Sequence, residues 1–144
     1  MRIAVISDTH DHIRAGLPAR LKAADEIWHL GDVCAPDTLV EFEQLGLPLH
    51  VVMGNCDSHP WPLTLDLERG GVRFHLTHIP PRHAPAGAQV MLHGHTHAAR
   101  DETDAAGVRW LNPGAVSRPR EGPASFAWLT VEAGRLVSWK LVPL

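Results

Sequence analysis

The stretch that decides the fold is MRIAVISDTHDHIRAGLPARLKAADEIWHLGD, residues 1–32. The apolar run Met1–Ser7 predicts a buried strand. Leu17–Ala24 predicts a helix with Pro18 near its first turn, where a missing N–H costs little. Glu26–Leu30 predicts a second strand. A strand, a helix and a strand in this order are typical of a parallel sheet.

The same alternation continues, and then the pattern changes. Pro36–Leu45 predicts a helix that ends before Gly46, and Pro48–Met53 predicts a third strand. A proline-rich loop is expected over Pro80–Gly87, followed by a lone strand at Ala88–Leu92. The remaining strands are expected in hairpins. The expected hairpins pair Leu63–Leu67 with Val72–Thr77, Ala99–Thr103 with Val108–Leu111, and Phe126–Val131 with Leu136–Val142. A parallel half followed by hairpins favours two packed sheets with helices outside.

Length and composition favour one ordinary globular domain over residues 1–144. The chain has a 15.8 kDa mass, 44% hydrophobic and 20% charged residues and a formal net charge of -3. It contains no run of lysine and arginine, so a general nucleic-acid binder is not indicated. It shows no signal-peptide pattern, no membrane-spanning apolar stretch and no disulfide framework in its two cysteines. A cytoplasmic protein without membrane partners is expected.

Side chains that commonly bind metals follow one predicted strand after another. The seven are Asp8, His10, Asp32, Asn55, His78, His95 and His97. In an open α/β sheet, ligands bind at the carboxyl ends of the strands, so these side chains are expected to converge. Asp8 and His10 lie two residues apart and would share one side of an extended segment. Seven ligands exceed the need of one metal and suit two metals that share a carboxylate.

Each of these residues also has an ordinary explanation. Asp32 and Asn55 follow glycines and could be plain turn residues, and a lone histidine such as His78 is more often structural. His93, His95 and His97 alternate, as they would on a solvated strand end. The joint pattern favours a metal site because every position falls at a predicted strand end. The other histidines carry no ligand motif and are interpreted mostly as surface or packing residues: His12, His29, His50, His59, His75 and His83.

The motifs DTH, GD, GNCD, TH and GHTH, which begin at Asp8, Gly31, Gly54, Thr77 and Gly94, occur in this order. Together they resemble a calcineurin-like metallophosphoesterase, and most of all the small single-domain bacterial and archaeal phosphodiesterases. The resemblance covers nearly the whole chain, including NPGAVSRPR at residues 112–120. It implies an α/β fold, a four-layer α-β-β-α sandwich of two mixed sheets with flanking helices.

The resemblance also implies a ligand set and a reaction. One metal would be held by Asp8, His10, Asp32 and His97, and the other by Asp32, Asn55, His78 and His95, with Asp32 bridging. Two divalent ions are implied, manganese being favoured over iron, zinc, nickel or cobalt. A metal-bridging hydroxide would attack the phosphorus of a small phosphodiester or nucleotide-like substrate in line. Asp32 and Asn55 would be the catalytic residues.

Three alternative functions stay open. The same centre would serve a phosphomonoesterase or a nucleotide pyrophosphohydrolase. A non-catalytic binding scaffold of the same fold is the alternative outside enzymes, but the complete ligand set argues against it. A structural or redox metal protein that uses Cys34 and Cys56 is a third possibility, and a homo-oligomer is left open.

The chain departs from the family where relatives place a proton donor. Many of them have histidine after the asparagine of GN, whereas this chain has Cys56, a poor match for protonating a leaving group. We therefore expect a preference for good leaving groups, unless His59 substitutes. Asp57 is expected to orient its neighbours. Cys34 and Cys56 are interpreted as small core residues, the usual fate of free cysteines.

Other departures concern the rim of the site. Ile79 and Ala115 replace a common glycine and a common serine, and a lid or helix is expected to be missing over Ile79–Ala88. That would leave an open site. The candidate substrate-binding residues are Asn55, His59 and Arg118, and Arg120 could also bind phosphate. Trp61 could stack on a base, although an interface or core position is favoured.

Overall fold

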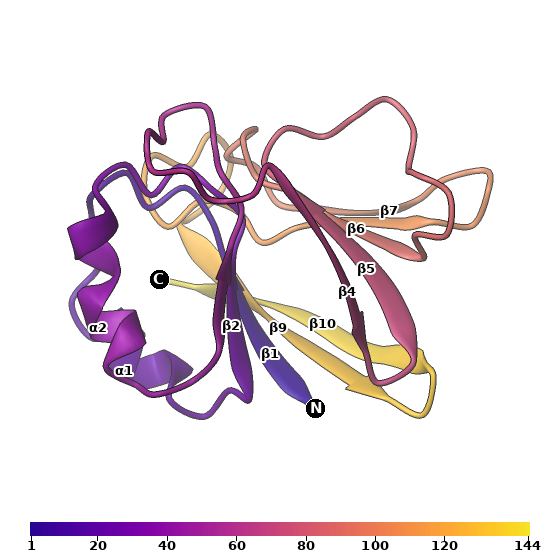
Figure 1. Cartoon of the computed structure of the whole chain (residues 1–144), viewed down its shortest axis with the longest axis horizontal. Coiled ribbons are helices and arrows are strands. Elements are labelled where there is room, and N and C mark those ends of the chain that lie inside the picture. The colour runs from indigo at the N-terminus through magenta and orange to yellow at the C-terminus, as the bar shows by residue number, and fades with distance from the viewer.

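Ten strands form two mixed sheets of five strands each in the computed structural model, which describes residues 1–144 (Figure 1). The first sheet has the order β10-β9-β1-β2-β3, and the second has the order β4-β5-β6-β8-β7. This confirms the α/β class and the two mixed sheets that the resemblance implies. No helix of the structure is long and apolar enough to cross a membrane.

The predicted alternation of strands and helices builds half of the first sheet. Its parallel strands are β1 (Arg2–Ile6), β2 (Glu26–His29) and β3 (Leu49–Val51). The helices between them are α1 (Leu17–Leu21), the 3-10 helix η1 (Pro36–Leu39) and α2 (Val40–Glu43). All of these elements are shorter than predicted. No side chain caps a helix start, and the helices begin at Leu17-Pro18 and Pro36, as the prolines indicate.

The three predicted hairpins are confirmed. They pair β4 (Thr64–Arg69) with β5 (Val72–Thr77), β7 (Arg100–Thr103) with β8 (Arg109–Asn112), and β9 (Ser125–Glu132) with β10 (Arg135–Pro143). The lone strand β6 (Val90–Leu92) lies parallel to both β5 and β8. The last hairpin joins the first sheet, because β9 pairs antiparallel with β1.

Alternation along β1 shows how the sheet separates two cores. Ile3 and Val5 belong to a cluster of 13 buried residues drawn from both sheets, while Ala4 and Ile6 belong to a cluster of 12 shared with the helices. Trp28 and Phe74 meet edge to face in the first cluster, with ring centroids 5.2 Å apart. Burial on both faces explains why the β1 sequence is continuously apolar.

The helices lie against the outer face of the first sheet, and the second sheet carries none (Figure 1). The connection between β5 and β6 runs over Ile79–Gln89 without a helix, as the proline-rich sequence predicts. Above the sheets, the loops that follow β1, β2, β3, β5 and β6 gather at one end of the molecule (Figure 1).

Glu26, at the opposite end of β2, ties the two sheets together. One of its buried carboxylate oxygens accepts a hydrogen bond from Trp28 Nε1 at 2.9 Å. The other accepts one from Nε of Arg69, at the end of β4, also at 2.9 Å. Because both donors are largely buried, removing their acceptor leaves them unsatisfied.

Glu26→Ala is expected to lower the free energy of unfolding by about 3 kcal/mol, as breaking one side of a buried ion pair does. Urea denaturation measures this. The matched control is Glu102→Ala, since Glu102 is 67% exposed and pairs with Arg100 at 3.4 Å. That change should cost less than about 1 kcal/mol. Equal losses in the two variants would show that Glu26 does not hold the sheets together.

Candidate metal centre

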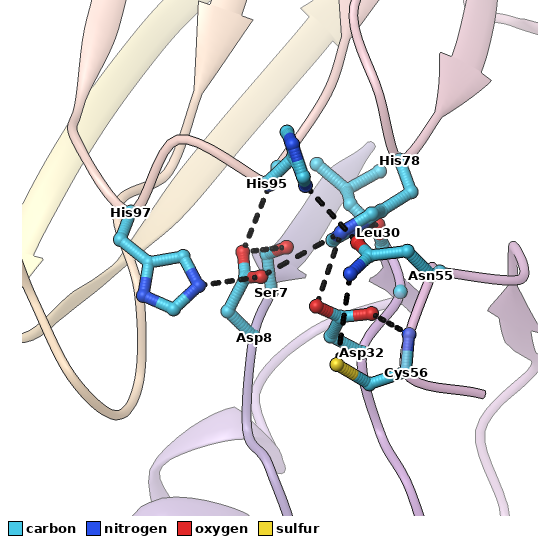
Figure 2. Close-up of polar contacts among 12 residues, drawn as sticks. Ser7, Asp8, Leu30, Asp32, Asn55, Cys56, His78, His95 and His97 are labelled. Atoms are coloured by element: carbon cyan, nitrogen blue, oxygen red, sulfur yellow. Dashed lines mark hydrogen bonds and ion pairs between the residues drawn. The ribbon is translucent and has the colours of Figure 1, made fainter.

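The ligand-type side chains predicted from the sequence converge at the carboxyl ends of the strands, as Figure 2 shows for six of the seven. Three imidazoles point their Nε2 atoms at two carboxylates. His97 Nε2 lies 3.2 Å from Asp8 Oδ1, and His78 Nε2 lies 3.2 Å from Asp32 Oδ2. His10 Nε2 lies between the carboxylates, 3.5 Å from Asp32 Oδ2 and 3.8 Å from Asp8 Oδ1.

The Asp8 carboxylate has one satisfied oxygen and one unsatisfied oxygen. Oδ2 accepts hydrogen bonds from Ser7 Oγ at 2.6 Å and from the His95 backbone N–H at 3.2 Å. Oδ1 is buried and has no hydrogen-bond donor, and His78 Nε2 is buried without a partner as well. Such atoms are costly unless something binds them. Their orientation toward the same space fits a cation.

The histidines are held in the form that ligates metals. His78 Nδ1 donates a hydrogen bond to the Leu30 carbonyl at 2.7 Å, and His97 Nδ1 donates one to the Arg118 carbonyl at 2.8 Å. A carbonyl can only accept, so each Nδ1 carries a proton, and Nε2 is the nitrogen left to bind a metal. His10 Nε2 lies 3.4 Å from His97 Nε2. The set of imidazoles and carboxylates therefore fits a divalent metal.

The two ligand groups implied by the family resemblance differ in exposure. The ligand atoms of Asp8, His10, Asp32 and His97 all lie within 4.8 Å of one another. The other group adds two exposed residues, with His95 Nδ1 3.0 Å from Asn55 Oδ1. The His95 and His78 rings are neighbours, with centroids 5.2 Å apart. All seven predicted residues are thus adjacent, and Asp32 lies between the groups.

The backbone at the centre is not extended, so the expectation that Asp8 and His10 share the side of an extended segment is wrong. Their φ angles are 56° and 45°. Asp32, His95 and His97 are also left-handed, with φ of 60°, 70° and 56°. This conformation is uncommon outside glycine, and its concentration in five candidate ligands is typical of a functional site.

Glycines let the loops approach each other closely. A Cβ on Gly94 would collide with Ser7 Oγ and with the Asp8 carboxylate. A Cβ on Gly54 would collide with the Asp32 carboxylate and backbone. Neither glycine has a positive φ, so the requirement here is space. The glycines of the GN and GH motifs are therefore part of the site.

Asp57 joins two of the loops from below the site. Its Oδ2 accepts the backbone N–H groups of Asp32 at 2.9 Å and Gly54 at 2.7 Å, and its Oδ1 accepts that of Cys34 at 2.7 Å. The carboxylate is buried and charge-assisted hydrogen bonds of this kind are strong. The orienting role expected for Asp57 is confirmed.

His29 belongs to the supporting structure, although the sequence carries no motif that indicates it. It is fully buried, its Nδ1 accepts the Gly31 N–H at 3.1 Å, and its Nε2 lies 3.0 Å from Thr9 Oγ1. Burial lowers the pKa of His29 to about 3, and the Asp57 carboxylate opposes this only in part. The ring is therefore neutral and fixes the turn before Asp32.

The cysteines are not core residues, so that interpretation is wrong. Cys56 is exposed and Cys34 is half-buried, because both lie in the loops at the mouth of the site. Cys34 Sγ lies 3.7 Å from His10 Nδ1. Burial, together with the nearby Asp11 carboxylate, raises the pKa of Cys34 to about 11. Burial and the Asp32 carboxylate also raise the pKa of Cys56.

His93 has a structural role. Its Nδ1 donates to the Gly94 carbonyl at 2.9 Å, and its Nε2 accepts from Arg100 Nη1 at 3.1 Å. Burial lowers the pKa of His93 to about 4, although the Gly94 hydrogen bond opposes the shift. His59 packs against Trp61 with the two rings tilted by 51° and their centroids 4.5 Å apart.

Two aspects of the rim concern substrate. Trp61 is half-buried and packs against the cluster of 12 buried residues that the first sheet shares with the helices. This agrees with the core position favoured from the sequence. Arg118 is exposed, has a φ of 54° and lies near enough to the Cys56 thiol to work against the rise of its pKa. Its guanidinium is thus near the Cys56 thiol.

Two mixed sheets with a cluster of histidines and carboxylates at one end define an α/β domain with a candidate metal site. The calcineurin-like phosphoesterase superfamily domain matches residues 1–134, and the chain belongs to this superfamily. No curated protein matches the chain. Protein TM1076 of Thermotoga maritima is 30% identical, with a TM-score of 0.73 over 99% of each chain.

Two more distant structures share the fold. A novel archaeal phosphodiesterase is 21% identical, with a TM-score of 0.79 over 100% of each chain. Vps29 of Entamoeba histolytica, solved in complex with zinc, is 23% identical, with a TM-score of 0.77 over 99% of this chain and 97% of Vps29.

Asp57→Asn is expected to lower the affinity for divalent metal by about 10- to 100-fold, as the loss of an outer-shell partner does. The amide replaces one acceptor oxygen with a donor, which then faces a backbone N–H group. Calorimetric titration of the chelator-treated protein with Mn²⁺ measures the affinity. Asp66→Asn is the control, because Asp66 is 81% exposed and pairs only with His75. Equal affinities in the two variants would show that Asp57 does not support the metal centre.

Proposed function

We propose that the protein is a metal-dependent phosphodiesterase with a dinuclear centre. The observation that carries the proposal is the pair of buried, unpartnered atoms Asp8 Oδ1 and His78 Nε2, which face the same space as Asp32. A buried carboxylate oxygen and imidazole nitrogen without partners favour a bound cation. Membership of a phosphoesterase superfamily makes hydrolysis of a phosphoester the expected reaction.

The residues that would hold the ions follow the two ligand groups. Asp8, His10, Asp32 and His97 would hold one, and Asp32, Asn55, His78 and His95 the other, with Mn²⁺ the favoured ion. Bound divalent ions supply a hydroxide nucleophile near neutral pH and offset the negative charge of the phosphoryl group. Asp32 contributes to both groups because its Oδ2 lies near His10 and near His78.

The remaining work falls to residues at the mouth. Asn55 is exposed beside His95, where its amide can orient a phosphoryl oxygen. Arg118 is exposed without a carboxylate partner, and a guanidinium there favours an anionic substrate. Asp32 Oδ1 accepts a hydrogen bond from the Cys56 N–H at 2.9 Å. This hydrogen bond orients the carboxylate so that its other oxygen, Oδ2, faces His10 and His78.

A diester is favoured over a monoester or a nucleotide pyrophosphate bond for one structural reason. The connection over Ile79–Gln89, which follows His78, contains no helix, and an open site admits a phosphorus with two ester groups. The similarity to the archaeal phosphodiesterase points the same way. The unpartnered polar atoms in the interior favour a bound metal over a scaffold that binds none.

Chelator-treated protein is expected to hydrolyse bis-p-nitrophenyl phosphate only after Mn²⁺ is added. Asp32→Ala should reduce turnover to that of the metal-free protein, because both ligand groups lose a carboxylate. Release of p-nitrophenol is followed by absorbance. Asp66→Ala, at an exposed position on β4, should retain full activity. Folded protein that shows no turnover with Mn²⁺, Fe²⁺, Co²⁺, Ni²⁺ or Zn²⁺ would contradict the proposal.

Cys56→His is expected to accelerate hydrolysis of diphenyl phosphate by about a hundredfold, the contribution of a positioned general acid. The thiol at this position keeps its proton, so phenol, a poor leaving group, departs slowly in the natural protein. Bis-p-nitrophenyl phosphate needs no acid, and its rate should change little. Cys56→Ser, which supplies no acid, should leave the ratio of the two rates unaltered. The absence of a leaving-group preference in the natural protein would refute the idea.

A further inference from the structure

A groove of about 650 Å³ lies beside the segment that carries the candidate ligand His10. Its apolar wall is formed by Ile13, Ala15, Leu17 and Leu144. Its polar side chains are all basic, namely His12, Arg14 and Arg20. No acidic side chain lines the groove, although the chain has more acidic than basic residues, 16 against 13. The groove therefore selects for anions.

Arg14 is held in position without a counter-charge. The side chain is half-buried, and its Nε donates a hydrogen bond to the Val116 carbonyl at 3.3 Å. The two terminal nitrogens of the guanidinium donate no hydrogen bond within the protein. Anchoring Nε while leaving the terminal nitrogens free presents a fork, which is the geometry that phosphate oxygens accept.

Arg20, on α1, adds a second guanidinium. It lies over the Phe126 ring, 5.4 Å from the centroid, and forms no ion pair. Arg69, Arg100 and Arg109 pair with carboxylates, whereas Arg14 and Arg20, like Arg118, do not. Two guanidinium groups without carboxylate partners in one groove favour binding of an anion there.

The backbone that anchors Arg14 also supports the metal centre. Val116 N–H donates to the Ser7 carbonyl at 3.0 Å, and both the N–H and the hydroxyl of Ser117 donate to the Asp8 carbonyl, at 3.1 and 3.2 Å. Arg118 follows directly and binds His97 through its carbonyl. One short segment thus links the groove to the rim of the centre.

We propose that this groove binds a second phosphate of the substrate, one that does not react. The inference rests on the proposed phosphodiesterase function and narrows its substrate class. The preferred substrate is a diester with a phosphate monoester on one of its two ester groups, as in a nucleoside bisphosphate derivative. The reacting phosphorus lies at the metal centre, and the dianionic phosphate binds Arg14 and Arg20.

The test compares two substrates that differ by one group. Both are p-nitrophenyl esters of thymidine 5′-phosphate, one with a 3′-hydroxyl and the other with a 3′-phosphate. In the Mn²⁺-loaded natural protein, the 3′-phosphate should raise kcat/KM about tenfold or more, mainly through KM. The ratio should fall to about one in Arg14→Gln. Arg135→Gln, at an exposed arginine that starts β10, is the matched control and should keep the natural ratio.

A second variant controls for misfolding, and a binding measurement controls for failure of the enzyme assay. The Arg20 side chain makes no hydrogen bond to the protein, so Arg20→Gln should leave the fold intact and should also lower the ratio. Calorimetry of the chelator-treated protein with thymidine 3′,5′-bisphosphate should show binding that Arg14→Gln abolishes. If this binding persists while bis-p-nitrophenyl phosphate is never hydrolysed, the groove is supported and the phosphodiesterase function fails.

Other outcomes overturn the inference. A 3′-phosphate effect that is equal in the natural protein and in both arginine variants would place that phosphate elsewhere. No effect on kcat/KM, with inorganic phosphate binding as tightly as the bisphosphate, would show that the groove takes free phosphate and not the substrate. Turnover of bis-p-nitrophenyl phosphate without any bisphosphate binding would support the phosphodiesterase function and contradict the phosphate site in the groove.

Discussion

The organisation of the centre follows from one buried charge, the Asp8 carboxylate, whose Oδ1 has no hydrogen-bond donor. Removing such an oxygen from water is costly, so its surroundings must be arranged for a cation to replace the lost hydration. The arrangement is visible in the imidazoles, whose protons are directed away to the Leu30 and Arg118 carbonyls. It is visible again at Gly94, which must lack a side chain because Ser7 and Asp8 occupy the space.

Periodicity and motif order were enough to predict most of the architecture. The strand-like runs gave the parallel strands and the hairpins, and the polar residues after each strand gave the candidate ligands. Helix lengths were overestimated, because helices this short are set by packing on the sheet and not by their own propensity.

What could not be predicted is the structure that supports the ligands. The hydrogen bonds of His29 to Gly31 and Thr9 depend on neighbours brought together only by folding, and no local pattern marks them. The left-handed backbone at Asp8 and His10 is stabilised by contacts with the loop after β2, so an extended segment was the natural but wrong expectation. The exposure of Cys56 likewise follows from tertiary position, since free cysteines are usually buried.

The separation between the cores and the ligands bears on how the protein matures. Neither of the two hydrophobic clusters contains a candidate ligand, and Asp57 already fixes the loops around Asp32 and Gly54 through backbone N–H groups. Burial of apolar surface, which drives folding, is therefore complete without the ions. If the centre holds divalent ions as proposed, a newly made chain would fold first and be loaded afterwards, and it would be able to exchange one divalent ion for another while it remains folded. The ion that is present would then reflect the supply in the cell as much as the preference of the site.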